Sequence, residues 1–307
     1  MHEKLVLLPS RFRCAGSIYG ILFVNPAIAA VNMSWTSIGN AGDGADGSTG
    51  YGAVGYAYKI GTYDVTNAQY VDFLNSKGSS NSAGIFNATM GFTGTSGSNI
   101  TQSGVSGSYQ YSVNSTYANM PVVGVTWFDA ARFSNWLGNG QGNASMETGA
   151  YTLNGASSGI ITVNLGAIVY IPNENEWYKA AYYNGASSTY SLYPNGQNKI
   201  ISTDANYWPI GTGLADVGYG TPSSYGIYGM GGNVYQWNDA VIGLSRGLRG
   251  GDWDDYGGFL LASSCRGFAV PSDVYAGLGF RVASVPEPTS VFLVIFGSGV
   301  MLTLRKR

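Results

Sequence analysis

Three segments of the chain space their apolar residues as a short helix does when it buries one face. They are residues 64–75, 126–137 and 170–181. In the first, Thr66 and Gln69 form a capping-box pair, in which each side chain bonds the backbone N–H of the other residue. We therefore predict three short, capped, amphipathic helices. The inward positions of the first two are Tyr70, Phe73, Leu74, Ala130, Phe133, Trp136 and Leu137, and the capping pair of the third is Asn173 and Glu176.

The segments between these helices read as short strands, turns and loops. Residues 58–63, in which apolar and polar residues mix, predict a short strand. Residues 120–125 are almost entirely apolar and predict a buried strand. Beyond residue 185 the apolar residues show no strong helical spacing, so we expect only short strands and turns there. Three further segments are polar or glycine-rich: 31–56 (an extended lead-in), 76–119 (a long surface excursion) and 138–169 (a hairpin region).

The N-terminal segment differs in composition from the rest of the chain. Lys4, Arg11 and Arg13 precede a mostly apolar run, which ends in the small-x-small pattern of residues 27–29. This order is typical of a secretory signal peptide, and the run is too short for a spanning helix. We assign residues 1–29 to a signal peptide and expect export; the alternative is a buried N-terminal strand.

The C-terminal segment, residues 285–307, has its own pattern. After Pro286-Glu287-Pro288 come 14 mostly apolar residues, 291–304, and then Arg305-Lys306-Arg307. As a helix those residues would measure about 21 Å, less than a hydrocarbon core of about 30 Å. The segment resembles the PEP-CTERM sorting tail of bacterial surface proteins, which implies an exosortase-type enzyme as partner, transient membrane contact and a cell-surface or extracellular location. A plain membrane anchor is the alternative.

Charge is sparse in the central part of the chain and mostly negative. Six of the 15 basic residues and two of the 17 acidic residues lie in the two terminal segments, which leaves 9 bases and 15 acids, a net charge of −6. There is no basic stripe, so nucleic acid is excluded as an expected partner. The abundance of Gly, Ser, Asn and Tyr is typical of a loop-rich exported domain.

Cysteine and histidine are almost missing from the central part. Cys14 and the single histidine, His2, both fall inside the expected signal peptide, which leaves Cys265 alone. An internal disulfide, a Ser–His–Asp triad and a zinc site built from His and Cys are therefore excluded for the exported chain.

Six motifs in order make the chain similar to the sulfatase-modifying-factor, or formylglycine-generating enzyme, family. That family has helices reading V-T-N-x-x-Y-x-x-F, P-V-x-x-V-S-W-x-D-A and L-P-T-E-A-E-W-E-x-A-A, then G-L-Y-D-M-x-G-N-V-W-E-W, R-G-G-S-W and G-F-R. The resemblance implies one α+β domain over residues 57–284 with the C-type-lectin-like fold, loop-rich, with a few short helices and small antiparallel sheets. The matching segments are Val65–Phe73, Pro121–Ala130, Ile171–Ala181, Gly226–Trp237, Arg249–Trp253 and Gly279–Arg281.

The catalytic cysteines of that family have no counterpart in this chain. Its enzymes oxidise a sulfatase cysteine with two cysteines, five apart, that bind copper, and the thiolate pair suits Cu(I). Asp255 stands at the first cysteine position, and residues 259–261 stand near the second. Cys265 reads as a small core residue in a buried strand beside Arg266. No catalytic residue is therefore assigned, and copper is not an expected cofactor.

The calcium sites of the family carry over in part. One uses an Asn and the backbone of the next residue; the other uses a turn in which this chain has lost two oxygen ligands, at Gly229 and Gln236. Fewer carboxylates weaken a calcium site, so calcium is a possible cofactor only. The matching positions are Asn206 and Tyr207 for the first site, and Gly232, Val234 and Gln236 for the second.

Two functions remain. The first is a non-catalytic, ligand- or polymer-binding surface protein, with extracellular polysaccharide or another surface protein as partner, because aromatic side chains beside carboxylates suit such ligands. The second is an oxidoreductase of the formylglycine-generating or non-haem iron type acting on a protein cysteine. A solvated turn around a core tryptophan is the simpler interpretation of the cluster. The ligand-binding candidates are Tyr235, Asp252, Trp253, Asp254, Asp255, Tyr256 and Arg266.

Overall fold

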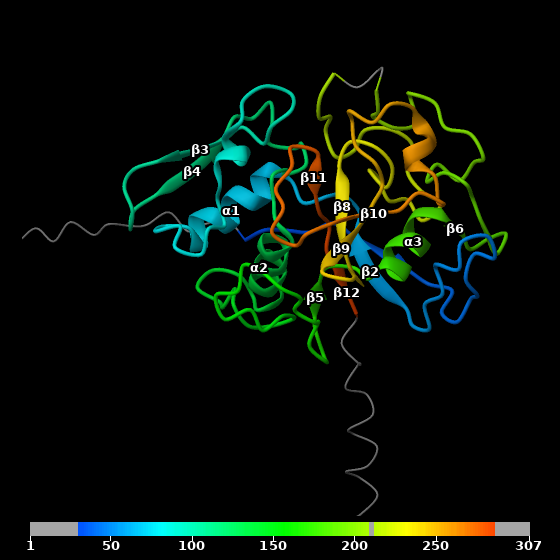
Figure 1. The fold of residues 1–307 in the computed structure, drawn as a ribbon, viewed down its shortest axis with the longest axis horizontal. Helices are drawn as coiled ribbons and strands as arrows, with labels where there is room; N and C mark the ends of the chain where they lie inside the picture. The colour runs from blue at the N-terminus through cyan, green and yellow to red at the C-terminus, as the bar shows by residue number, and fades with distance from the viewer. Residues whose placement is uncertain (1–29, 209–211, 286–307) are drawn as a thin grey trace, which may run out of the picture.

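A computed structural model describes residues 30–208 and 212–285 (Figure 1). The predicted signal peptide and all of the predicted sorting tail except Val285 lie outside these ranges. The described chain contains α1 (Asn67–Lys77), α2 (Trp127–Gly138) and α3 (Glu174–Tyr182), with two single-turn helices, η1 (Ala88–Gly91) and η2 (Gly258–Leu261). None of its helices is long and apolar enough to cross a membrane.

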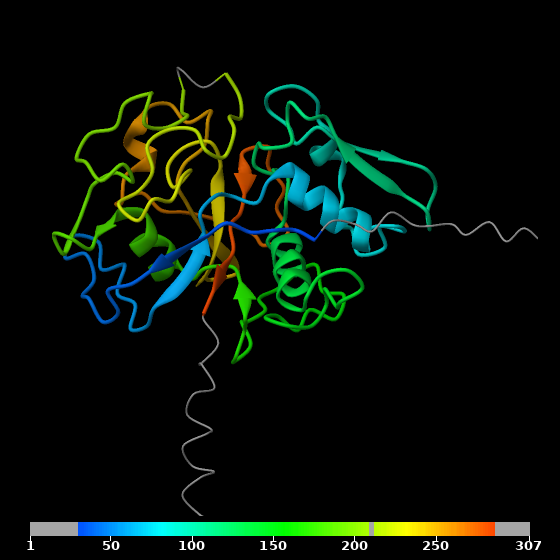
Figure 2. The same ribbon diagram turned by 180° about the vertical axis from the view of Figure 1, so that it is seen from behind.

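Two four-stranded sheets form the centre of the molecule. The first has the order β1 (Trp35–Ile38), β2 (Tyr58–Gly61), β12 (Ala283–Ser284) and β5 (Val169–Tyr170), all antiparallel. Ala283 pairs with Ile60 on one side and with Tyr170 on the other, so the last strand is enclosed by earlier ones. Figure 2 shows β1 and β2 from behind, which places part of the predicted lead-in within this sheet.

The second sheet carries the candidate site. Its order is β10 (Gly267–Ala269), β9 (Ser245–Arg249), β8 (Tyr235–Ile242) and β11 (Leu278–Gly279), with β11 parallel to β8. Two small hairpins complete the fold: β3 (Ile100–Ser103) with β4 (Gln110–Val113), and β6 (Tyr183–Asn184) with β7 (Thr189–Tyr190). The first hairpin lies beside α1 on one side of β8 and β11, and α3 lies on the other side (Figure 1).

All three predicted helices and their caps are confirmed. Thr66 Oγ1 accepts the Gln69 N–H at 3.2 Å, and Gln69 Oε1 accepts the Thr66 N–H at 3.0 Å. The same reciprocal box starts α2 and α3. The predicted strand at 58–63 is also confirmed, as β2.

Three of the loop and strand predictions were wrong. Residues 120–125 are buried but form no sheet strand, because Gly124 takes a left-handed φ of +74° and only Pro121 makes a bridge, to Thr66. The excursion at 76–119 contains the β3–β4 hairpin, which packs on α1 through two hydrogen bonds between Asn75 and the Tyr111 backbone. The region 138–169 holds turns in place of a hairpin.

Arg281 is a buried charged residue of the core that makes four polar contacts. Its side chain is fully buried, and Asp64, which is equally buried, accepts from it at 3.0 Å. The guanidinium also donates to the carbonyl oxygens of Gly61 and Tyr228 and to Gln236 Oε1. It thereby joins the end of β2, the turn before β8 and β8 itself.

Replacement of Arg281 by Met is predicted to destabilise the protein strongly. Removing one member of a buried ion pair leaves the other charge without compensation, which costs about 3–5 kcal/mol. Lys59→Met serves as the control, because Lys59 is an exposed basic residue on β2 and such surface changes stay within about 0.5 kcal/mol. Chemical denaturation of both variants measures the difference, and equal midpoints would refute the assigned role of Arg281.

Candidate functional site

The predicted ligand-binding cluster occupies the turn that follows β9. Gly250 and Gly251 begin this turn with φ values of +105° and +71°, which glycine adopts at little cost. A Cβ on Gly251 would lie 2.9 Å from Asp255 Oδ2, so the carboxylate packs directly on the backbone there. The two glycines of the R-G-G motif thus allow the chain to turn sharply from the sheet to the surface.

The carboxylates at 252 and 255 fix the shape of this turn. Asp255 Oδ2 accepts the Asp252 N–H at 2.9 Å, and Asp252 Oδ1 accepts the Asp254 N–H at 3.1 Å. Burial and, after it, the nearby Asp255 carboxylate raise the pKa of Asp252 to about 7. Asp255, at the expected position of the first catalytic cysteine, is therefore a turn-forming acceptor.

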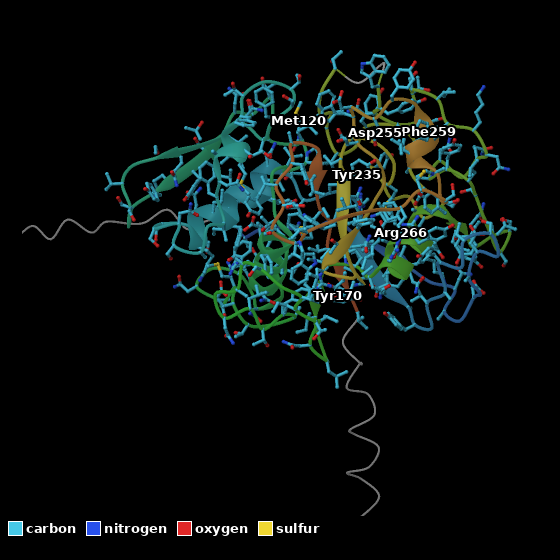
Figure 3. All side chains as sticks on the ribbon, viewed as in Figure 1. Met120, Tyr170, Tyr235, Asp255, Phe259 and Arg266 are labelled. Atoms are coloured by element: carbon cyan, nitrogen blue, oxygen red, sulfur yellow. The ribbon has the colours of Figure 1, made fainter. Side chains whose placement is uncertain are left out.

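Beside this turn lies an exposed aromatic platform, which we define as Trp208, Tyr256 and Phe259. These side chains are 39%, 71% and 60% exposed, which is unusual for aromatic residues of this size. The rings of Trp208 and Tyr256 are in contact, with centroids 4.6 Å apart. Figure 3 shows Phe259 beside Asp255 at the same end of the molecule.

Backbone hydrogen bonds hold the platform in place. The Trp208 N–H donates to the Asp255 carbonyl oxygen, and the Gly257 N–H donates to that of Trp208, both at 3.1 Å. The two segments form a short parallel bridge at Trp208 and Tyr256. Trp208 was not predicted, because it lies 44 positions before Asp252 and only the fold brings it to the turn.

Trp253, another predicted ligand contact, is partly buried. Its ring packs against a small buried cluster of Val123, Leu214 and Val234. Its indole N–H is buried and has no hydrogen-bond partner among the described residues. For this residue the simpler interpretation, a core tryptophan under a solvated turn, describes the packing better.

Tyr235 and Arg266 line a small cavity of about 100 Å³ behind the turn, together with Cys265. Burial raises the pKa of Tyr235, and the negative charge of the nearby Asp255 adds to the shift. Arg266 is engaged by Glu174, at 2.6 Å, and Glu174 also pairs with the buried Arg249. Arg266 thus stands at the rim, partly exposed, and shares its single carboxylate partner with Arg249.

Cys265 is not in a buried strand, contrary to the sequence prediction. It lies in the turn before β10 and is half-buried, and its thiol donates to the Phe259 carbonyl oxygen at 2.9 Å. Burial raises the pKa of the thiol, which keeps it protonated at neutral pH. The position that the sequence assigned to the core is thus partly open to the cavity.

The geometry does not support a calcium site at Gln236. Its Oε1 accepts from both Trp177 Nε1 and Arg281 Nε, and its Nε2 donates to the Gly229 carbonyl oxygen at 2.6 Å. Both lone pairs of the amide oxygen are in use, and a guanidinium stands next to it. The second predicted set, Gly232, Val234 and Gln236, therefore lacks an available side-chain ligand.

In the first predicted calcium set, protein contacts hold Asn206 through its amide nitrogen and its backbone oxygen. Asn206 Nδ2 donates to Gly213 O at 2.8 Å and to Asn233 Oδ1 at 3.0 Å, and the Asn206 carbonyl oxygen accepts the Asn233 N–H. Tyr207 is buried against Leu261 under η2. The described residues contain no group of three or more acidic, histidine or cysteine side chains suited to a metal ion.

Asp252→Asn is predicted to change how stability depends on pH. Because the folded-state pKa of Asp252 is about 7 and its unfolded value is about 3.9, ionisation opposes folding increasingly as pH rises from 4 to 7. The variant should gain on the order of 1 kcal/mol relative to the wild type between pH 5 and pH 8. Melting curves across this range measure it, with Asp254→Asn, its exposed neighbour, as control. A constant difference would show that Asp252 ionises normally.

Comparisons with known proteins agree with this fold. Over 191 residues the chain is 28% identical to serine/threonine-protein kinase pkn1 of Chlamydia pneumoniae, an alignment that covers 54% of this chain and 24% of that protein. This chain thus matches about a quarter of the length of that curated relative.

Two solved structures resemble the model over most of its length. Treponema denticola variable protein 1 has 21% identity and a TM-score of 0.59, covering 84% of this chain and 97% of that one. CarF has 22% identity and a TM-score of 0.54, covering 83% and 99%. At these identities the likeness concerns the fold alone, and it confirms the predicted α+β, loop-rich class.

The family model described as the sulfatase-modifying factor enzyme 1-like domain matches residues 41–285. The match includes both four-stranded sheets apart from β1, all three helices, and the turn that carries the candidate site. The chain therefore belongs to the family of proteins with a sulfatase-modifying factor enzyme 1-like domain.

Proposed function

We propose that this protein is an exported, non-catalytic surface protein that binds a neutral polysaccharide chain on its aromatic platform. The observation that carries this proposal is the pair of exposed, mutually packed rings of Trp208 and Tyr256, held by backbone hydrogen bonds beside hydrogen-bonding carboxylates. Such rings offer flat apolar area to a sugar ring, while polar groups at their edge fix its hydroxyls.

Charge around the platform favours a neutral polymer over an acidic one. Asp252, Asp254 and Asp255 lie in the adjoining turn, and the central part of the chain carries a net charge of −6. The nearest arginines, Arg249 and Arg266, are already paired with Glu174. Glu174 balances only one of these two cations, so an anionic chain would meet the three carboxylates of the turn against one net positive charge.

The oxidoreductase alternative has less support, because this chain lacks the required thiols. Copper-dependent cysteine oxidation needs a soft thiolate pair, and the first position is Asp255, whose carboxylate is a hard ligand committed to the turn. The remaining thiol, Cys265, is kept protonated by its raised pKa. Oxygen chemistry at this site would lack both the metal ligands and an electron source.

Export and surface display form part of the proposal and rest on the terminal sequence patterns. Residues 1–29 have the order of a signal peptide, and residues 285–307 have that of a PEP-CTERM tail. The apolar residues 291–304 would hold the chain at the membrane until an exosortase-type partner processes the tail. A polymer-binding domain suits such a destination, where extracellular polysaccharide is available.

Trp208→Ala and Tyr256→Ala are each predicted to weaken polysaccharide binding. Loss of an interface aromatic costs about 1–2 kcal/mol, or roughly five- to thirtyfold in Kd. The control is Phe268→Ala, which removes another exposed aromatic side chain, on β10. Binding of the full-length protein to immobilised neutral bacterial exopolysaccharides and β-glucans, measured by biolayer interferometry, tests this.

The binding assay distinguishes the parts of this proposal. Selective loss in the two platform variants supports it. Equal affinities for all four proteins would place the ligand elsewhere on the molecule. Preference for an acidic polymer would contradict the charge argument, and lack of binding to every polymer would contradict the function itself.

A further inference from the structure

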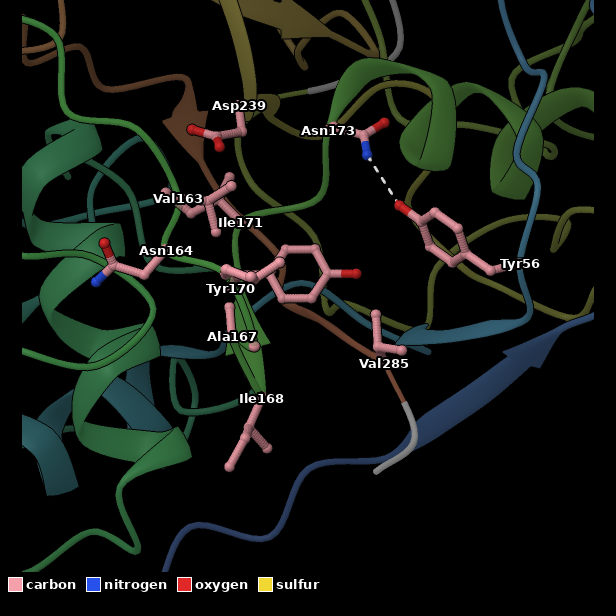
Figure 4. Close-up of a pocket in the computed structure, with 12 residues that line it drawn as sticks. Tyr56, Val163, Asn164, Ala167, Ile168, Tyr170, Ile171, Asn173, Asp239 and Val285 are labelled. Atoms are coloured by element: carbon pink, nitrogen blue, oxygen red, sulfur yellow. Dashed lines mark hydrogen bonds between the residues drawn. The ribbon is translucent and has the colours of Figure 1, made fainter. Parts of the chain in front are cut away.

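A second surface feature, separate from the aromatic platform, lies beside Val285, the last described residue. A cavity of about 490 Å³ opens there between Tyr56, Tyr170, the segment before β5, and Val285 (Figure 4). Its floor is polar but internally satisfied, since the hydroxyls of Tyr56 and Tyr170 both donate to Glu176. Its rim is not covered by any other described segment.

The rim is an apolar loop, residues 160–168, that is open to solvent. Val163 is 43% exposed, Leu165 is 106% exposed and Ile168 is 45% exposed. No charged residue occurs anywhere between Glu147 and Glu174. A cluster of exposed aliphatic side chains without a single charge is uncommon on a soluble surface and marks a contact site.

The loop is held rigidly, so its apolar side chains cannot simply fold inward. Asn164 Nδ2 donates to the Gly149 carbonyl oxygen and to Thr152 Oγ1, both at 2.9 Å, and the Asn164 N–H donates to Ala150 O at 2.7 Å. Val163 and Leu165 flank this fixed residue. Their exposure is therefore imposed by the hydrogen bonding of the residue between them.

The position of Val285 suggests what covers this loop. Val285 lines the same cavity, and β12 ends at the edge where the segment leading to β5 lies (Figure 1). The apolar segment begins at Val291, six residues on, and six residues span at most about 20 Å. If residues 291–304 enter a bilayer, this edge of the domain is held within that distance of the lipid surface.

We propose that residues 160–168 form a lipid-contacting loop, which inserts Leu165 and its apolar neighbours into the membrane interface while the tail is embedded. The proposal rests on the membrane-embedded tail of the proposed function. Apolar side chains on a surface segment bury about 5–10 Å into the boundary between headgroups and acyl chains. The uncharged loop suits this role, because an acidic face would be repelled by anionic lipids.

An environment-sensitive fluorophore at the loop tip tests the proposal. The exported chain, residues 30–307 with Cys265→Ser, would carry L165C labelled with a nitrobenzoxadiazole dye and be reconstituted into phosphatidylethanolamine–phosphatidylglycerol vesicles. The matched control is V105C, since Val105 is 70% exposed in the β3–β4 turn. We expect the emission at position 165 to shift to the blue and brighten in vesicles, while that at position 105 stays unchanged.

Three other outcomes would overturn the proposal, each in a recognisable way. If the protein floats with the vesicles but both positions behave alike, the loop does not contact lipid, although the tail still anchors. If the protein does not float with the vesicles, the tail does not insert into the membrane, and the proposal for the loop is contradicted as well. If the shift at position 165 depends on protein concentration and not on lipid, the loop contacts a second copy of the chain.

Discussion

The buried guanidinium of Arg281 is the constraint on which the arrangement of this fold depends. A charge with no exposure to water must find partners within the protein, and Arg281 finds four of them in segments far apart in the sequence. Gln236, one of these partners, in turn accepts from the indole of Trp177 on α3. One side chain near the end of the domain thereby fixes the end of β2, the start of β8 and, through Gln236, the third helix.

This arrangement determines which parts of the molecule can face outward. With β8 fixed, β9 ends beside it and the chain must turn at Gly250 and Gly251 before reaching η2. The carboxylates of Asp252 and Asp255 hold the shape of that turn, so Asp254 and the aromatic rings are left as its exposed surface. The same guanidinium stands beside Gln236, where a related protein with a carboxylate could offer a cation ligand. Arg281 thus accounts for the stable frame, and its hydrogen bond to Gln236 occupies part of the amide oxygen that stands at the family's calcium-ligand position.

Local features could be predicted from the sequence, and features that depend on distant contacts could not. The capping pairs at Thr66 and Asn173 lie three residues from their partners, so pattern alone was sufficient. Residues 120–125 have strand composition, but the left-handed backbone of Gly124 and the lack of a neighbouring strand override it. Trp208 shows the same limit for the site, because its partner Tyr256 becomes its neighbour only in the fold.

The central claim is that this domain keeps the family fold while its site has turned from cysteine chemistry to ligand binding. The most direct measurement is mass spectrometry of a sulfatase-motif peptide incubated with the purified full-length protein, copper and oxygen. The account predicts that the peptide cysteine remains unconverted, and equally so in a Cys265→Ser variant. Conversion to formylglycine that is lost in the variant would contradict it, since the single protonated thiol would then support the reaction.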